Sequence, residues 1–334
     1  MTAPQLHHAG NEEVLAILAE RQRIVLTTHP NPDGDALGSE YAMYHMLTGM
    51  GKEVRIVNID PMPENLRFLN GTVDYETWNP VEHEELLARA DAIIALDFNH
   101  CDRMREMGDA ACGSTAHRIV IDHHLEPQPF ADTYLSVPDA SSTAEIVYDL
   151  LEAGAMELTR EIALGIYVGL MTDTGSFRFD RTTPRVHRIA ARLLEHGVDP
   201  LDIHRKIFDD YPMNRTALLG RVLAGIEQHF DGRVTILSVT RQMFEDTGTT
   251  VEDVENVVNY GLGIRGVEVT ALITELEDGH KISFRSRGKF SVNDIAGEFG
   301  GGGHRLAAGA RLDDPDGETV REKVIGRFGR LFQQ

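Results

Sequence analysis

Residues 24–48 read IVLTTHPNPDGDALGSEYAMYHMLT, and this stretch decides the fold of the first half of the chain. The apolar run at 24–28 predicts a buried strand, and the turn-rich segment HPNPDGD at 29–35 follows it directly. Residues 35–48 then predict a helix that ends at Gly49. A strand, a polar loop and a helix in this order indicate an α/β sheet flanked by helices.

The rest of the first half repeats this alternation. Three further apolar runs predict strands, at 54–59, 92–96 and 118–121. Helix starts are predicted from the capping-box spacing of Ser142 and Glu145, from Thr159, and from Thr183 followed by Pro184. Strands that alternate with helices predict a parallel sheet.

The chain has 334 residues, a length that fits two domains. We predict an α/β fold in three parts. They are a parallel-sheet catalytic domain at 1–190, a helical connector at 191–230 and a smaller α/β domain at 231–334, with the active-site cleft between the two domains.

The composition is that of an ordinary globular protein, with 42% hydrophobic and 25% charged residues. No stretch approaches the roughly 18 apolar residues of a membrane helix, and the first residues lack the pattern of a secretory signal. The two cysteines, Cys101 and Cys112, predict neither a CxxC pair nor a disulfide framework. The expected compartment is therefore the cytoplasm.

The charge is strongly acidic, with 32 basic against 53 acidic residues and a net charge of −21. This balance argues against a protein that coats long nucleic acid. Residues 281–310 depart from it, because they carry five basic and two acidic residues, so their net charge is +3 and that of the remaining chain is −24. A local basic patch on an acidic protein indicates a small anionic ligand.

Aspartate and histidine clusters occur at four points where predicted strands or helices end: His29, Asp33 and Asp35; Asp97; Asp122, His123 and His124; and Asp173. Each alone has a plainer explanation, such as a helix-capping turn. Together they predict a metal site, and carboxylates with some imidazole suit Mn²⁺ or Mg²⁺ better than zinc. A carboxylate can bridge two cations about 3.5–4 Å apart, an arrangement that hydrolyses phosphate esters.

Four segments resemble, in order, the motifs of the DHH phosphoesterase superfamily. They are HPNPDGDALGS at 29–39, ALD at 95–97, DHH at 122–124 and TDTGSFRF at 172–179. The later segment GGGGHRLAAGA, at 300–310, resembles the DHHA1 domain that follows in many members. The resemblance spans nearly the whole chain. The length and the two-domain layout are similar to the NrnA-like subgroup, which contains oligoribonucleases that are also phosphatases of 3′-phosphoadenosine 5′-phosphate (pAp).

The resemblance implies roles for individual residues. One Mn²⁺ would be held by His29, Asp33 and Asp97, and a second by Asp35, Asp97, His123 and Asp173, with Asp97 bridging and Mg²⁺ as the alternative ion. Asp122 is expected to orient a histidine through a hydrogen bond. His124 is expected to face the scissile phosphate, so His124, Asp97 and His123 are the predicted catalytic residues.

The glycine run suggests a site for the remote part of the substrate. Without the resemblance it would be interpreted as a flexible turn, but the likeness to DHHA1 favours backbone that approaches an anion closely. Arginine can pair bidentately with phosphate. The predicted substrate-binding residues are Gly301, Gly302, Gly303, His304, Arg285 and Arg287.

The expected function is a Mn²⁺-dependent phosphoric ester hydrolase that cleaves short oligoribonucleotides (nanoRNA) to mononucleotides and pAp to AMP. The expected partners are short RNA, pAp or its dinucleotide relative pApA, with no long duplex and no membrane; a homodimer is compatible with the sequence. A phosphodiesterase of cyclic di-AMP or pApA is the first alternative, and an inorganic pyrophosphatase is a weaker one. An alternative from another functional class is a nucleotide-binding module without catalytic activity. The intact metal motifs argue against this alternative.

Overall fold

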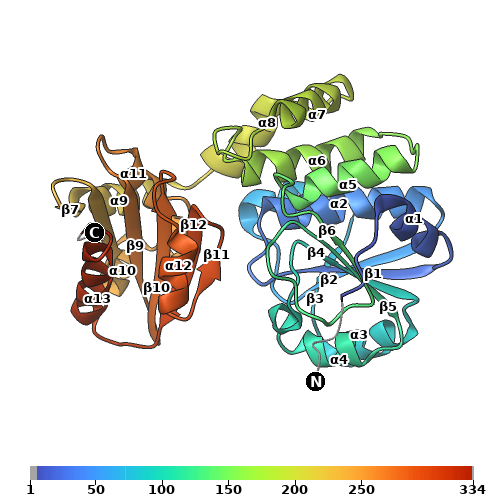
Figure 1. Cartoon of the computed structure of the whole chain (residues 1–334), viewed down its shortest axis with the longest axis horizontal. Helices are drawn as coiled ribbons and strands as arrows, with labels where there is room; N and C mark the ends of the chain where they lie inside the picture. The colour runs from blue at the N-terminus through green and yellow to red at the C-terminus, as the bar shows by residue number, and fades with distance from the viewer. Residues whose placement is uncertain (1–5, 72, 333–334) are drawn as a thin grey trace. The chain divides into compact units, whose positions relative to one another are not determined.

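The computed structural model describes residues 6–71 and 73–332, and the chain divides into two compact units at 1–210 and 211–334 (Figure 1). The division falls inside the predicted connector at 191–230; the three-part division itself stays a prediction. Within the described ranges, no helix combines the length and the apolar character needed to cross a membrane.

The first unit contains a six-stranded sheet in which every neighbouring pair of strands is parallel. Its spatial order is β3-β2-β1-β4-β5-β6. The strands are β1 (Arg23–Thr28), β2 (Glu53–Asn58), β3 (Tyr75–Thr77), β4 (Ala92–Leu96), β5 (His117–Asp122) and β6 (Thr133–Ser136).

The register of the three central strands brings their carboxyl ends to one edge of the sheet. Thr28 of β1 lies beside Leu96 of β4, and Leu96 lies beside Ile121 of β5. The residues that follow these strands therefore lie at the same edge. In open α/β sheets this is the edge at which ligands bind.

Helices cover both faces of this sheet, as Figure 1 shows. One face packs against α1 (Asn11–Ala19), α2 (Gly34–Gly49), α5 (Thr143–Ala153) and α6 (Arg160–Asp173), and the other against α3 (Pro80–Arg89) and α4 (Met107–Gly113). Two further helices, α7 (Pro184–Glu195) and α8 (Pro200–His204), follow α6. Short 3-10 or π turns lie at Glu64–Leu69, Cys101–Met104 and Arg205–Asp209.

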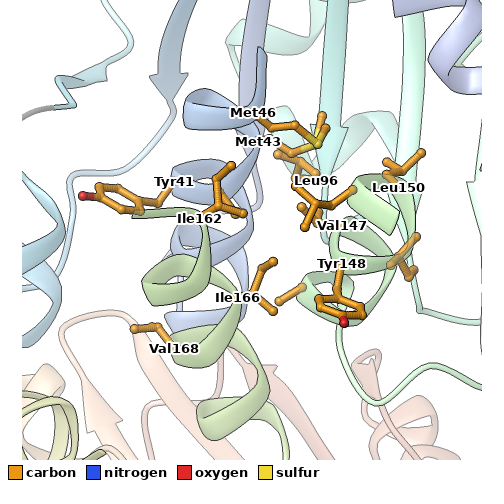
Figure 2. Packing of buried hydrophobic residues seen from close by; sticks show 14 of the residues in the cluster. Tyr41, Met43, Met46, Leu96, Val147, Tyr148, Leu150, Ile162, Ile166 and Val168 are labelled. Atoms are coloured by element: carbon orange, nitrogen blue, oxygen red, sulfur yellow. The ribbon is translucent and has the colours of Figure 1, made fainter. Parts of the chain in front are cut away.

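The core on the first face is formed where α2, α5 and α6 meet the sheet. Figure 2 shows Met43 of α2, Val147 of α5 and Ile166 of α6 among the side chains packed near Leu96 of β4. The central strands are apolar and buried on both faces, which is the pattern that a covered parallel sheet requires. This packing holds the ends of α2, α5 and α6 beside the carboxyl edge of the sheet.

The second unit is built on a mixed sheet of order β11-β12-β10-β9-β8-β7. Its strands are β7 (Glu227–His229), β8 (Val234–Val239), β9 (Val269–Leu276), β10 (Gly279–Ser286), β11 (Gly302–Gly303) and β12 (Ala307–Leu312); β8 and β9 are parallel and the other neighbours are antiparallel. One face packs against α12 (Val292–Glu298) and α13 (Gly317–Gly329). The other packs against α9 (Met213–Ala224), α10 (Arg241–Thr247), the turn at Val251–Val254 and α11 (Val258–Gly263).

Most elements expected from the sequence are confirmed, including the α/β fold, the opening strand and helix, and the three later strands. The hydroxyls of Thr159 and Thr183 cap α6 and α7 as predicted. Of the two hydrogen bonds predicted for the capping box at Ser142 and Glu145, the structure shows one. The Ser142 hydroxyl accepts a hydrogen bond from the Glu145 backbone N–H at 3.1 Å, but the Glu145 carboxylate is taken by the backbone and hydroxyl of Ser141 instead.

Two expectations are corrected. The predicted helical segment up to residue 230 ends earlier, because Glu227–His229 pair with β8 as an edge strand. Cys101 and Cys112 are joined in a disulfide, although the sequence predicted no disulfide framework. A short turn at Cys101–Met104 followed by α4 folds the chain back on itself between the two cysteines, and their spacing alone gave no sign of this turn.

Candidate metal centre

The four predicted clusters meet at the carboxyl edge of the parallel sheet. His29 follows β1, Asp97 follows β4, and Asp122 is the last residue of β5. The loop after β1 leads into α2, where Asp33 is the N-cap and Asp35 lies in the first turn. Asp173 differs from these residues because it lies at the end of a helix, as the last residue of α6.

Two groups of candidate ligands share one carboxylate. His29, Asp33 and Asp97 form one triad, and Asp35, Asp97 and His123 form another, each with its ligand atoms within 4.8 Å of one another. The two oxygens of Asp97 face different histidines. Oδ2 lies 3.4 Å from His29 Nε2, whereas Oδ1 lies 3.5 Å from His123 Nε2. Asp97 thus lies between the two groups with one oxygen for each.

Asp173 lies with the second triad. Its Oδ2 is 3.5 Å from His123 Nε2, on which an Asp35 oxygen also converges at 3.8 Å. As the last residue of α6, Asp173 places a negative charge at the negative end of the helix dipole. This arrangement is unfavourable unless a positive charge lies nearby.

Backbone carbonyls orient both histidines of the triads. His29 Nδ1 lies 2.9 Å from the Pro30 carbonyl, and His123 Nδ1 lies 3.3 Å from the Ala140 carbonyl. A carbonyl oxygen only accepts, so Nδ1 of His29 carries the hydrogen and its Nε2 offers a lone pair to the carboxylate cluster. Arg181 Nη1 donates to the same Ala140 carbonyl at 2.9 Å and lies 3.4 Å from His123 Nδ1, so it contacts both groups.

Asp122 and His124 form a third group with Asp97, in which the ligand atoms also lie within 4.8 Å of one another. The buried Asp122 carboxylate accepts from the His124 backbone N–H at 3.0 Å and lies 2.7 Å from His124 Nδ1. These bonds fix the ring, as an orienting role for Asp122 requires. Burial lowers the pKa of the His124 imidazole, but Asp122 and Asp97 outweigh burial and raise it above its usual value.

The amino end of α5 supplies contacts that the sequence analysis missed. The backbone N–H groups of Thr143 and Ala144 donate to the two oxygens of Asp35, at 2.7 and 2.9 Å. The Thr143 hydroxyl donates to Asp97 Oδ1 at 2.9 Å. The Ser142–Glu145 spacing predicted the start of this helix but not its contacts. Asp97 and Asp35 are 46 and 108 positions from Thr143 in the sequence, and only the fold brings them together.

The site concentrates negative charge in a buried place. Burial, followed by repulsion from neighbouring carboxylates, raises the pKa values of Asp97 and Asp173 well above normal and that of Asp35 to about 6. Among the described residues, no ion pair joins Asp33, Asp35, Asp97 or Asp173 to a lysine or arginine. Buried charges of one sign need compensation, and the oxygen and imidazole donors fit divalent cations such as Mn²⁺.

The backbone at Asp97 is itself unusual. Its φ of +66° lies in the left-handed region, which is uncommon for residues other than glycine, although asparagine and aspartate adopt it more often than most. The Asp97 N–H donates to the Ile121 carbonyl at 3.0 Å, which ties this turn to the neighbouring strand. Strained conformations of this kind persist where the surrounding structure enforces them, and they cluster at functional sites.

In the second unit, the predicted glycine run forms an edge strand. Gly302 and Gly303 pair with β12 as β11, and a side chain at Gly301 would lie 2.1 Å from the Gly309 carbonyl. Gly302 is exposed, and a side chain built there would make an ordinary contact of 3.8 Å with Asn293 Oδ1. The His304 backbone N–H donates to the Ala307 carbonyl.

The two predicted substrate-binding arginines already have partners within this unit. The guanidinium of Arg287 donates to the carbonyls of Leu262 and Ile264, at 2.6 and 3.3 Å. Arg285 Nη1 donates to the Phe284 carbonyl at 2.9 Å. A phosphate would therefore compete with backbone carbonyls for Arg287.

Comparison with known proteins finds one family match within each unit. Residues 23–170 match the family model described as "DHH family, N-terminal domain", and residues 231–330 match that of the "DHHA1 domain". The chain is 37% identical over 302 residues to the bifunctional oligoribonuclease and PAP phosphatase NrnA of Thermus thermophilus, an alignment that covers 90% of this chain and 88% of that protein.

Two further relatives show the range of the similarity. The crystal structure of an exopolyphosphatase-related protein from Bacteroides fragilis superposes with a TM-score of 0.91 at 32% identity, covering 97% of each chain. The cyclic-di-AMP phosphodiesterase GdpP of Geobacillus thermodenitrificans is 27% identical over 314 residues, which cover 89% of this chain but only 46% of that protein. The carboxylate and histidine cluster, both domain matches and the full-length similarity lead to one conclusion: the chain belongs to the DHH family of phosphoesterases, and it is a phosphoric ester hydrolase with a C-terminal DHHA1 domain.

Proposed function

We propose that this chain is a two-metal, Mn²⁺-dependent phosphoesterase that hydrolyses short oligoribonucleotides to mononucleotides and pAp to AMP. The observation that carries the proposal is the position of Asp97, whose two oxygens lie 3.4 and 3.5 Å from the Nε2 atoms of two different histidines. A carboxylate that joins two ligand groups is the hallmark of a site for two cations. The oligonucleotide and pAp substrates follow from the name of the Thermus relative.

In this proposal one cation is held by His29, Asp33 and Asp97, and the other by Asp35, Asp97, His123 and Asp173. Bound cations would supply Lewis-acid activation of a water molecule and neutralise the phosphate oxygens. Carboxylate oxygens and imidazole nitrogens without cysteine favour Mn²⁺, and they accept Mg²⁺.

His124 is proposed to act on the leaving group. Asp122 holds the Nδ1–H of His124 and stabilises the positive ring, so a second proton on Nε2 can be donated to the leaving oxygen. Asp122 holds the His124 ring through the backbone N–H and Nδ1 of His124, so its proposed role is to orient this ring.

The second unit is proposed to bind the part of the nucleotide that does not react. Arg285 and His304, with the backbone of Gly301, Gly302 and Gly303, are the proposed contacts, and Arg287 would join them by exchanging a backbone carbonyl for phosphate. Binding that is remote from the reacting phosphate affects KM first, although it also helps to orient the reacting centre.

The test compares pAp, a diribonucleotide, pApA and cyclic di-AMP as substrates with Mn²⁺, and separates the products by chromatography. We expect turnover of pAp and the dinucleotide, loss of turnover with EDTA, and recovery on addition of Mn²⁺. Asp97→Asn should lower kcat further than Asp33→Asn, because only Asp97 serves both ligand groups. Asp132→Asn, an exposed carboxylate paired with Arg118, is the matched control and should retain activity.

The same measurement distinguishes the alternatives. Fast cleavage of cyclic di-AMP with slow cleavage of pAp would favour the cyclic-di-AMP phosphodiesterase, although the chain covers less than half of the GdpP relative. Near-wild-type kcat and unchanged metal content in Asp97→Asn would contradict the two-metal mechanism.

A further inference from the structure

We infer that Thr143 is a positioning residue for the candidate metal centre, and that its hydroxyl sets the second ligand group (Asp35, Asp97, His123 and Asp173) without setting the first. This inference rests on the proposed two-metal function. It assigns a role to the start of α5, a helix that contributes no predicted ligand.

The start of α5 holds the carboxylate of Asp35. Its carboxylate is fully buried and accepts from Thr143 N–H on Oδ2 and from Ala144 N–H on Oδ1. The Ser39 hydroxyl approaches Oδ1 at 3.4 Å. Each carboxylate oxygen has two acceptor positions, so these donors leave one position on Oδ2, the atom that lies 3.8 Å from His123 Nε2. These hydrogen bonds therefore leave Asp35 Oδ2 with one lone pair for a cation on the His123 side.

The Thr143 side chain contacts one of the two oxygens of Asp97. Thr143 donates its hydroxyl hydrogen to Oδ1, the oxygen on the His123 side, and leaves Oδ2 to face His29. Thr143 is fully buried, and its β-branched side chain has few rotamers available within a helix. A rigid hydroxyl on Oδ1 occupies one acceptor position of that oxygen and limits the direction in which Oδ1 can offer the other.

The two ligand groups are held by different hydrogen-bond donors. The two hydrogen bonds that Thr143 donates to candidate ligands fall on Asp35 and on the His123 side of Asp97. The first group is held by other means, because Asp33 Oδ1 accepts from the backbone N–H groups of Asp35 and Ala36. Loss of the Thr143 hydroxyl should therefore weaken one cation site and spare the other.

The experiment is a Mn²⁺ titration of metal-free protein by isothermal calorimetry, on the full chain. Thr143→Val removes the hydroxyl at constant shape, and Thr143→Ser keeps it. The pair Thr143→Ser and Thr143→Ala differs by the hydroxyl alone and decides the question if the valine variant does not fold. Thr27→Val is the matched control, because this buried hydroxyl of β1 has no hydrogen-bond partner among the described atoms.

We expect wild type to bind two Mn²⁺ per chain. In Thr143→Val and Thr143→Ala one of the two affinities should fall by about 10–100-fold, as is typical when a residue that orients a ligand is lost. Thr143→Ser and Thr27→Val should keep both affinities. The metal-free Ala variant should unfold at a somewhat lower thermal midpoint than the Ser variant, because it lacks one buried hydrogen bond. A single cooperative transition in both variants separates ligand positioning from a general role in folding.

Two results would overturn the inference. One is an unchanged pair of Mn²⁺ affinities in Thr143→Ala, and the other is an equal fall in both affinities. In either case a wild type that binds two Mn²⁺ and cleaves pAp leaves the proposed function intact. A wild type that binds no Mn²⁺, or cleaves none of the substrates, would instead show that the proposed function is wrong.

Discussion

Glu40 is a buried acid that takes no part in the proposed chemistry. Its side chain is fully buried in α2, where Oε2 accepts from Asn58 Nδ2 at 2.8 Å and Oε1 has no partner among the described atoms. Burial raises its pKa to about 8, so the folded chain keeps this proton at neutral pH whereas the unfolded chain releases it. Its contribution to stability is therefore present at low pH and is lost as the pH rises through about 8.

Glu40→Gln removes this titration while it keeps the acceptor for Asn58. We expect the variant to exceed wild type in unfolding free energy at pH 9 by a few kcal/mol, since each pKa unit corresponds to roughly 1.4 kcal/mol, and to differ little at pH 5. Urea unfolding of the metal-free proteins at both values measures the difference. Glu82→Gln, at an exposed position of α3, should show no such dependence, and equal stability of Glu40→Gln and wild type at pH 9 would contradict the argument.

At the residue scale, the sequence located the candidate ligands because each follows a recognisable strand or ends a helix. It could not locate Thr143, Ala140 or Arg181. Their contacts with Asp35 and His123 join segments far apart in sequence, and a backbone carbonyl that orients a ring has no signature in residue type. The partners of Arg287 were missed for the same reason.

The contact between α2 and α6 depends on glycine. A side chain at Gly38 would lie 2.5 Å from the Gly165 carbonyl, and one at Gly165 would lie 2.5 Å from the Gly38 carbonyl. Further along α6, a side chain at Gly169 would lie 2.6 Å from Asp35 Oδ1. The two helices therefore cross backbone to backbone, directly beneath the candidate metal centre.

Gly165→Ala should lower the unfolding free energy by about 1–3 kcal/mol or more, because neither backbone can move without disturbing the core. Gly220→Ala is the control, since this glycine lies in α9 with nothing within 4 Å and the replacement should stabilise by about 0.5–1 kcal/mol. Thermal unfolding with and without Mn²⁺ measures both. A stable Gly165→Ala variant would show that the helices can separate.

At the element scale, long segments with clear periodicity and caps were predictable, as α2, α6 and α7 show. The short edge strands β3, β6 and β7 were not, because three or four residues are too few to establish an alternating pattern. These strands exist because a neighbouring strand offers its free edge, which is a property of the assembled sheet.

The charge distribution of the whole chain favours short substrates. The net charge is −21, and the segment at 281–310 is locally basic with five basic and two acidic residues. A phosphate chain longer than this segment would meet an acidic surface. If about two phosphates are neutralised, the single-strand relation gives a log–log salt slope of roughly −1.4 for binding.

We therefore expect KM for a dinucleotide to rise by about sevenfold when the salt concentration is raised fourfold. A 24-nucleotide RNA should be cleaved less efficiently than the dinucleotide at every salt concentration. Steady-state kinetics across a salt series test both statements. A much steeper slope, or a preference for the longer RNA at low salt, would indicate an extended binding track.

At the scale of the whole molecule, the α/β class and both domain matches were predictable because the motifs span nearly the full length. The disulfide between Cys101 and Cys112 was not, since it arises from a local turn that the spacing of the cysteines does not reveal.

The left-handed backbone at Asp97 places folding and function in opposition at a single position. Glycine adopts a φ of +66° more readily than aspartate does, and neither glycine nor asparagine brings a buried negative charge. A chain selected only for stability would therefore discard this aspartate, and only selection for activity retains it. In a descendant released from that selection, position 97 is where drift should begin, while the glycine crossing and the apolar strands beneath it persist.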